Sequence, residues 1–152
     1  MKKPFELFIL IGLHIFLAAG ALYGGGSMII SPDGSLLGLP GDWLSGTPFH
    51  SYLIPGFILF ILLGLLPLFT IFGLLRKGNF MFPEALNMYQ NKYWSWTYSL
   101  YTGIISLVWI ITQQLLTSYF VLQPVIAATG LLIIVVTVSP RIQRYFEKEN
   151  LL

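Results

Sequence analysis

The chain has 152 residues, of which 56% are hydrophobic and only 9% are charged, with a formal net charge of +2. Soluble domains average about 25% charged residues, so this chain cannot cover a water-exposed surface with polar groups. It contains no cysteine, which excludes disulfide cross-links, thiolate metal sites and thiol redox chemistry. Length and composition together predict a single integral membrane domain over residues 1–152.

Three stretches of the chain contain no Asp, Glu, Lys or Arg. They run for 26 residues after Glu6, for 33 residues after Asp42 and for 48 residues after Lys92. Crossing a hydrocarbon core of about 30 Å takes about 20 helical residues, so the first two stretches hold one span each and the third holds two. The sequence therefore predicts an all-α bundle of four transmembrane helices, over residues 7–28, 51–75, 93–117 and 124–140.

The first apolar run also has features of a secretory signal. Met1-Lys2-Lys3 precedes the run, and Ala19-Gly20-Ala21 resembles a cleavage site. The run is long for the apolar part of a signal peptide, so a membrane span is the preferred interpretation. Cleavage would leave the predicted orientation of the other three spans unchanged.

The connection over residues 29–50 is more polar than the spans but carries many large apolar side chains. Ser31-Pro32-Asp33-Gly34 fits a type I turn, and the apolar residues on both sides could pair as a small β-hairpin. A flexible linker would contain few large apolar side chains. We therefore expect a short ordered loop that covers the outer end of the bundle. A solid structural cap is the preferred interpretation, and a ligand pocket beneath the loop is the alternative.

The basic residues predict the orientation of the spans. With four spans, all eight Lys and Arg residues lie on one side with both termini, and Asp33 and Asp42 lie on the other. Cytoplasmic segments of membrane proteins are enriched in Lys and Arg. We expect both termini to be cytoplasmic and residues 29–50 to be outside. The basic residues are then topology signals, and no nucleic-acid partner is predicted.

Small residues indicate where the helices approach each other. Gly20 and Gly24 lie four residues apart in the first span, as do Ala21 and Gly25. The fourth span carries small residues at a similar depth, within 127–130. Because helices in lipid associate through close packing of small residues, we expect these two patches to be in contact.

His14 is the main candidate for a functional residue, since ionisable residues inside a membrane are rare. One interpretation makes it a haem ligand, a hydrogen-bond donor to a quinone or a proton relay. The other makes it a neutral structural imidazole bonded to another helix. Haem ligation by two histidines needs a second histidine at the same depth, whereas His50 lies at the outer mouth of the second span. The structural interpretation is preferred, and no cofactor is predicted.

A pocket beneath the 29–50 connection is the second candidate for a ligand-binding site. We expect four residues to line it: Tyr23, Trp43, His50 and Gln113. Asp33, Asp42 and His50 match no compact metal motif, so no metal site is predicted. The sequence contains no nucleophile–base pair and no paired carboxylates within the spans, so no catalytic residue is predicted.

The segment from Gly24 to Gly56 resembles a pattern of uncharacterised small four-span inner-membrane proteins of bacteria. The residues that carry the resemblance are Gly24-Gly25-Gly26, Ser31-Pro32-Asp33-Gly34-Ser35, Leu39-Pro40, Thr47-Pro48-Phe49 and Tyr52-Leu53-Ile54-Pro55-Gly56. The chain also resembles DoxX-like proteins, in the layout of its spans only. The resemblance implies a bacterial plasma membrane and adds no catalytic residue.

Three functions from different classes fit the sequence. The leading hypothesis is a non-enzymatic accessory or stress-linked subunit, whose partners are the lipid bilayer and another membrane protein or a second copy of itself. The second is a redox-associated subunit that binds haem or quinone near His14. The third is a protomer of a transporter or channel. This function would need an oligomer, because four spans without a charged residue inside the membrane make a poor aqueous path.

Overall fold

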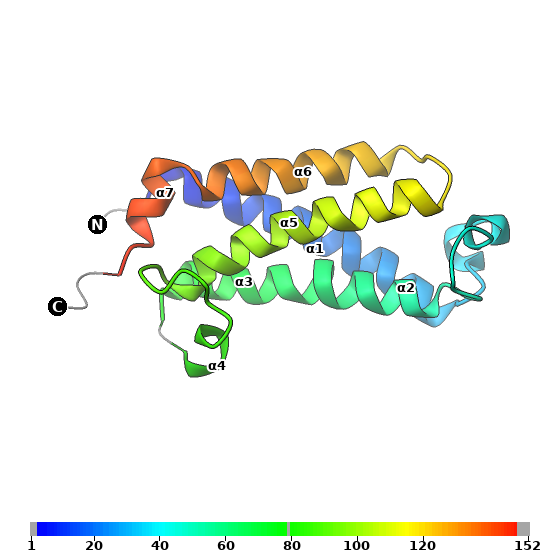
Figure 1. Ribbon diagram of the computed structural model, residues 1–152, viewed down its shortest axis with the longest axis horizontal. Helices are drawn as coiled ribbons and strands as arrows, with labels where there is room; N and C mark the ends of the chain where they lie inside the picture. Colours follow the sequence, from blue (N-terminus) through cyan, green and yellow to red (C-terminus); the bar gives the residue numbers. More distant parts are fainter. Residues whose placement is uncertain (1–2, 79, 149–152) are drawn as a thin grey trace.

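A computed structural model describes residues 3–78 and 80–148 (Figure 1). These residues form helices and turns with no strand, and their only bridged pair is Lys92 and Glu147. The described part of the chain is therefore all helical, as predicted from the sequence. Four helical rods run side by side: α1, the rod formed by α2, η3 and α3, then α5 and α6 (Figure 1).

The first rod is α1, Phe5–Ile30, which crosses behind the others at an angle (Figure 1). Its buried side chains recur every three or four residues, at Leu7, Leu10, His14, Leu17 and Ala21. That spacing keeps one stripe of the helix against its neighbours and leaves the rest of the helix exposed.

The second rod changes its helical type along its length. It comprises α2 (Leu53–Ile58), the π-helical segment η3 (Leu59–Leu65) and α3 (Leu66–Arg76). Pro67 stands at the start of α3 and has no backbone N–H to donate, so one α-type hydrogen bond is lost there. The chain accommodates this loss with wider π-type turns just before the proline, where Gly64 packs against Leu22 of α1.

The third and fourth rods, α5 (Trp94–Leu116) and α6 (Leu122–Thr137), form an antiparallel pair. Gly103 and Gly130 bring the two backbones together, because a Cβ on Gly103 would lie 2.9 Å from the Gly130 carbonyl oxygen. Gly130 therefore packs on α5, while Gly25 of α1 packs on α2 and η3. The expectation that the small residues of the first and fourth spans meet is wrong for both of these glycines.

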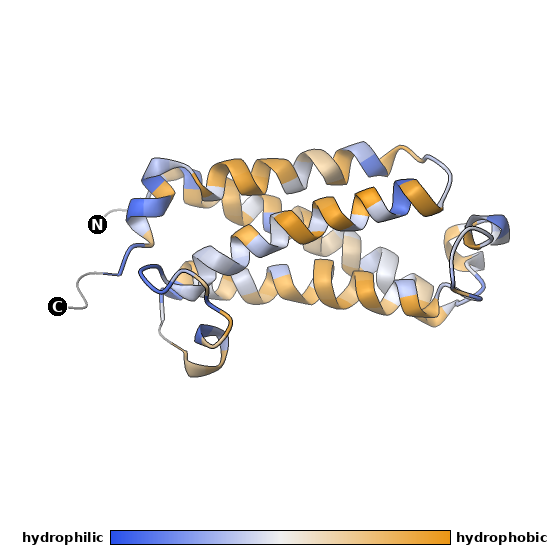
Figure 2. Ribbon diagram, viewed as in Figure 1, coloured by the Kyte–Doolittle hydropathy of each residue, from blue (hydrophilic) through white to orange (hydrophobic). Residues whose placement is uncertain are grey.

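Within the described residues, three helical segments are long and apolar enough to cross a membrane: Phe5–Ile30, Leu53–Arg76 and Trp94–Leu116. The fourth apolar helix, α6, is shorter. Large apolar side chains remain exposed along all four rods, as expected of helices that face lipid. Hydrophilic residues gather instead at the two ends of the molecule (Figure 2).

The long loop, defined here as residues 31–52, contains two 3-10 turns, η1 (Ser35–Leu37) and η2 (Gly41–Leu44). No strand forms in it, so the predicted β-hairpin is wrong. Gly34 and Gly38 have φ of 80° and 64°, and these left-handed conformations turn the chain away from an extended course on both sides of η1. The loop lies at the same end of the molecule as the turn between α5 and α6, which we call the loop end (Figure 1).

The opposite end carries most of the basic residues and is called the basic end. The start of α1, the 77–93 connection with α4 (Met81–Glu84), and α7 (Pro140–Tyr145) meet there (Figure 1). The 77–93 connection is tied to the segment after α7 by backbone bonds from Tyr93 N to Phe146 O and from Lys148 N to Asn91 O. Lys77 also donates to the carbonyl oxygen of Tyr145. The basic end is thus closed by hydrogen bonds between segments far apart in the sequence.

Candidate ligand-binding site

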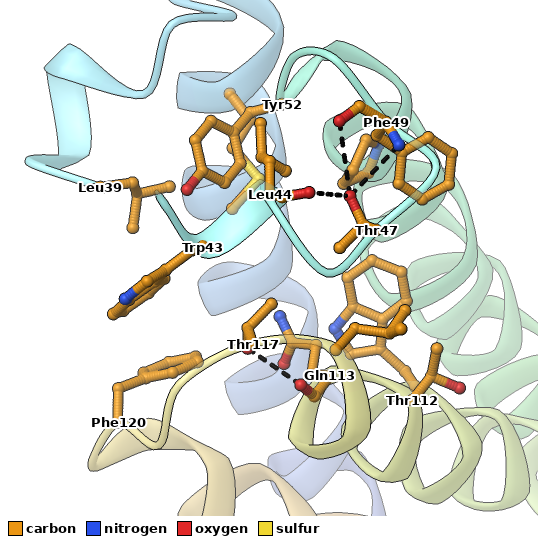
Figure 3. Close-up of a pocket in the computed structure, with 14 residues that line it drawn as sticks. Leu39, Trp43, Leu44, Thr47, Phe49, Tyr52, Thr112, Gln113, Thr117 and Phe120 are labelled. Carbon is orange, nitrogen blue, oxygen red and sulfur yellow. Dashed lines mark hydrogen bonds between the residues drawn. The ribbon is translucent and has the colours of Figure 1, made fainter. Parts of the chain in front are cut away.

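The long loop covers a cavity of about 100 Å³, called here the loop cavity (Figure 3). Residues of η2 and the following turn form its roof, and the last turns of α5 form its floor. Side chains reach into it from both sides, with Trp43 and Leu44 on the loop and Gln113 on α5 (Figure 3). The structure therefore contains a cavity where a solid cap would have none.

A second cavity, of about 330 Å³, lies beside the first and is called the lateral cavity. Its walls come mainly from α1, including Leu17 and Gly20, and from the long loop, with smaller contributions from η3, α5 and α6. Six residues line both cavities and form the wall between them: Met28, Leu39, Trp43, Trp109, Gln113 and Phe120. The volume of the lateral cavity lies at the lower end of the range typical of small-molecule sites, about 300–1,000 Å³.

Two contacts hold the long loop against the turn between α5 and α6. The rings of Trp43 and Phe120 stack with centroids 5.5 Å apart and planes inclined by 25°. Gly46 lies so close to α5 that a Cβ there would be 3.1 Å from the carbonyl oxygen of Leu116. Trp43 thus belongs both to the wall of the two cavities and to the contact that closes the loop end.

Most polar side chains around the loop cavity already have partners. The hydroxyls of Thr47, Thr112 and Thr117 donate to carbonyl oxygens three or four residues earlier in the chain. The Tyr52 hydroxyl donates to Pro40 O over 2.6 Å, and burial raises the pKa of that hydroxyl. These groups stabilise the walls and leave little hydrogen-bonding capacity for a ligand.

The Gln113 amide is different because it makes no hydrogen bond to any described residue, although its Oε1 is buried. The indole N–H groups of Trp43 and Trp109 also lack a protein acceptor among the described residues. All three side chains line both cavities. An otherwise apolar chamber therefore contains a small set of unused donors and one amide acceptor.

A second unpaired amide lies near this level. Gln123, in the first turn of α6, is fully buried, and neither its Oε1 nor its Nε2 has a hydrogen-bond partner in the described part of the chain. Ser99 bonds to Thr137 across the α5–α6 pair, and the same antiparallel register places Gln123 level with Gln113.

Three of the four predicted pocket residues line the lateral cavity: Tyr23, Trp43 and Gln113. Tyr23 stands at its edge, with 71% of its surface exposed. His50 instead lines a separate open hollow of about 600 Å³, together with Asp33. No group of three or more His, Cys, Asp or Glu side chains within the described residues could hold a metal ion.

His14 lines neither the loop cavity nor the lateral cavity. Its ring is fully buried, so it faces the other helices, and its Nδ1 lies 2.8 Å from the carbonyl oxygen of Leu10. That partner is one turn earlier in α1, so the expected bond to another helix is wrong. The ring Nε2 has no partner among the described residues.

Sequence analysis missed Trp109 and Phe120 as wall residues. Trp109 lies four residues before Gln113, which places both on one face of α5, so helical spacing could have identified it. No comparable signal marks Phe120, because its position depends on how the long loop folds back. Comparison of the chain with protein-family models, with curated proteins and with solved structures finds no match.

Proposed function

We propose that this protein is a small four-span integral membrane protein of a bacterial plasma membrane, with both termini cytoplasmic, that acts as a non-enzymatic accessory subunit. Its working part is the loop end, where the cavities lie. The α6 rod is the fourth span, although at 1.5 Å per residue its 16 residues reach only about 24 Å. A short span is accommodated by local thinning of the bilayer.

The observation that carries this proposal is the one-sided distribution of the Lys and Arg residues along the molecule. The described basic residues gather at the basic end: Lys3, Arg76, Lys77, Lys92, Arg141, Arg144 and Lys148. Asp33 and Asp42 lie at the loop end. Lys2 and residues 149–152 lie outside the described residues. Exposed apolar side chains cover the rods between the two ends, which supports a membrane placement with the basic end in the cytoplasm.

Reporter fusions test the orientation. A reporter active only in the periplasm should give signal when inserted at residue 40, and a reporter active only in the cytoplasm should give signal at the C-terminus. The reverse pattern would refute the proposed orientation. A periplasmic signal from both positions would refute an even number of spans.

A binding role at the loop end predicts that the two cavities, and not the basic end, determine activity in the cell. Gly20 lines the lateral cavity and has no atom within 4 Å of a Cβ built on it. Gly20→Leu would therefore fill the cavity without distorting α1. Gly12, in the same helix, is equally open but lines neither cavity, so Gly12→Leu is the matched control. A deletion phenotype rescued by the control and not by Gly20→Leu supports the proposal.

His14 favours a second candidate, a redox-associated subunit that binds haem or quinone. The specific observation is its buried Nε2, which has no partner and could ligate a metal or accept a proton. An ultraviolet and visible absorption spectrum of the purified protein, oxidised and reduced, tests this candidate. A reversible haem or quinone signal that disappears in His14→Leu would favour it over the accessory role.

A further inference from the structure

We infer that the lateral cavity binds a neutral amphiphile that arrives from the surrounding lipid, with an apolar chain or ring in the cavity and one oxygen atom directed at the Gln113 amide. This inference rests on the proposed membrane placement and specifies the ligand of the proposed site.

Access from lipid follows from where the walls of the cavity lie. Glu6 of α1 pairs with Arg141 at the basic end over 2.8 Å, while Gly25 of the same helix packs against Phe60 at the loop end. Helix α1 therefore begins beside α6 and α7 at the basic end and lies against α2 at the loop end (Figure 1). The lateral cavity occupies the widening space, and its edge residues Phe16 and Leu122 are both more than half exposed. A lipid molecule could therefore enter sideways between α1 and α6.

The walls indicate a neutral ligand with a large apolar part. No Asp, Glu, Lys, Arg or His side chain lines the lateral cavity. An anionic or cationic head group would lose its hydration there without gaining a counter-charge, which is costly. The lining is aliphatic and aromatic, with Met28 as an adaptable filler. These features exclude a phosphate, a carboxylate or an ammonium group from the chamber.

The unused hydrogen-bonding groups indicate one oxygen atom on the ligand. The indoles of Trp43 and Trp109 can only donate, whereas the Gln113 amide both donates and accepts. A hydroxyl oxygen can accept from an N–H and its proton can go to the amide oxygen, so a hydroxyl satisfies both kinds of group. A carbonyl oxygen satisfies the donors alone. An alkane would leave the buried amide oxygen of Gln113 unpaired in an apolar chamber.

Tryptophan fluorescence provides the test, because Trp43 and Trp109 line the cavity while Trp94 and Trp96 are buried near the basic end. The protein is placed in lipid nanodiscs and titrated with a brominated long-chain alcohol, whose bromine quenches nearby indoles. A bromoalkane of equal length and the corresponding bromo fatty acid are titrated in parallel. A Trp94→Phe, Trp96→Phe variant isolates the signal of the cavity indoles. Nanodiscs of brominated phosphatidylcholine measure contact of the protein with bulk lipid.

We expect saturable quenching by the alcohol and weaker quenching by the alkane. The fatty-acid anion should quench no more than contact with bulk lipid does. Gly20→Leu should remove the saturable component and Gly12→Leu should keep it. Gln113→Leu should weaken binding of the alcohol about 2- to 10-fold, which is the effect of one hydrogen bond. The same substitution should leave the affinity for the alkane unchanged. Circular dichroism confirms that each variant retains its helices.

The outcomes separate this inference from the proposal on which it rests. Equal affinity for alcohol and alkane, or an unchanged affinity in Gln113→Leu, would overturn the assignment of an oxygen-bearing ligand. Absence of saturable quenching, with normal quenching by brominated phosphatidylcholine, would overturn the binding site while the membrane placement stands. Absence of quenching by brominated phosphatidylcholine would overturn the membrane placement and the inference together.

Discussion

Gly25 of α1 and Gly56 of α2 lie directly against each other. A Cβ on Gly25 would be 2.8 Å from the carbonyl oxygen of Gly56, and a Cβ on Gly56 would be 3.1 Å from the carbonyl oxygen of Gly25. Any side chain at either position would push the two backbones apart. Close backbone approach is a main source of helix association in lipid. This contact therefore fixes the loop end of α1 beneath the long loop.

Replacing Gly25 with alanine should destabilise the protein by about 1–3 kcal/mol, the usual cost of overpacking a close contact. The new methyl group would also lie 2.7 Å from the backbone nitrogen of Phe60. Gly20→Ala is the control, because a Cβ at Gly20 meets nothing within 4 Å and alanine favours helix over glycine. Unfolding in detergent, followed by circular dichroism, measures both. Equal stability of the two variants would contradict the packing argument.

The Trp43–Phe120 stack should control how often the long loop opens. An aromatic pair contributes about 0.5–1.5 kcal/mol beyond its buried area. Trp43→Ala should therefore increase amide exchange in the long loop by about 2- to 10-fold, without altering exchange in α5. Leu36→Ala is the control because Leu36 is more than half exposed on the same loop. Hydrogen exchange in nanodiscs measures both, and similar exchange rates in the two variants would show that the stack does not hold the loop.

The helical class could be predicted from the sequence. A long apolar segment in lipid must form hydrogen bonds within the protein for every backbone group, and few structures other than a helix allow this. The β-hairpin was wrong because residues 28–30, which precede the expected turn, belong to the last turn of α1, and the residues after it form the 3-10 turn Ser35–Leu37. The pairing of small residues was also wrong in part. Every span carries small residues, and the sequence does not say which helix each one meets.

The candidate site was partly predictable for a similar reason. Trp43 and Gln113 were identifiable as large or polar side chains near the outer ends of apolar segments, and the lateral cavity includes both. His50 was expected at the outer mouth of the second span. The turn at Thr47, whose hydroxyl accepts from the N–H of Phe49, leads the chain away and places His50 in a different hollow. Such short turns depend on local hydrogen bonds, which cannot be predicted from the hydropathy of the residues.

Asp33 should make the long loop sensitive to acid. Its carboxylate accepts hydrogen bonds from Ser31 Oγ, Ser35 N and Ser35 Oγ, over 2.5, 3.1 and 2.9 Å. The hydrogen bond from Ser31 is the largest cause of a pKa below the usual 3.8, followed by those from Ser35. Since the folded pKa is the lower one, the stabilisation is present above pH 3.8 and is lost as the pH falls through the folded value.

NMR of the Asp33 carboxyl carbon should therefore give a titration midpoint below 3.8, and the Ser35 amide resonance should move with it. Asp33→Asn should remove this transition from the Ser35 amide. Asp42→Asn, on the same loop, should leave it in place. A midpoint at or above 3.8 would show that the three hydrogen bonds do not hold the charged form.

His14→Leu should change the free energy of unfolding by less than about 1 kcal/mol. The ring bonds only to a carbonyl of its own helix, and an apolar side chain of similar size would remove a buried acceptor that has no partner. His14→Ala should cost more, because it leaves a cavity in the packed stripe of α1. If the leucine variant were the less stable of the two, the polarity of His14 and not its volume would be what the fold requires.

Asn87 organises the basic end through a complete set of hydrogen bonds. Its Nδ2 donates to Glu84 Oε1 and to Lys92 O, both over 2.9 Å. Its Oδ1 accepts from Thr97 Oγ1 over 2.5 Å and from Tyr89 N over 3.2 Å. The side chain is almost entirely buried, so each of these partners depends on it. A single amide thereby fixes the 77–93 connection to the first turn of α5.

Asn87→Ala should destabilise the protein by at least about 2 kcal/mol, because several buried groups lose their partner at once and an unsatisfied group costs about 1–3 kcal/mol. Gln90→Ala is the matched control, since Gln90 is an exposed amide on the same connection. Glu84 also pairs with Lys148 over 2.5 Å. Amide exchange should therefore rise in Asn87→Ala at Lys148, whose N–H bonds to the Asn91 carbonyl. If Asn87→Ala and Gln90→Ala unfolded alike, the amide would have no organising role.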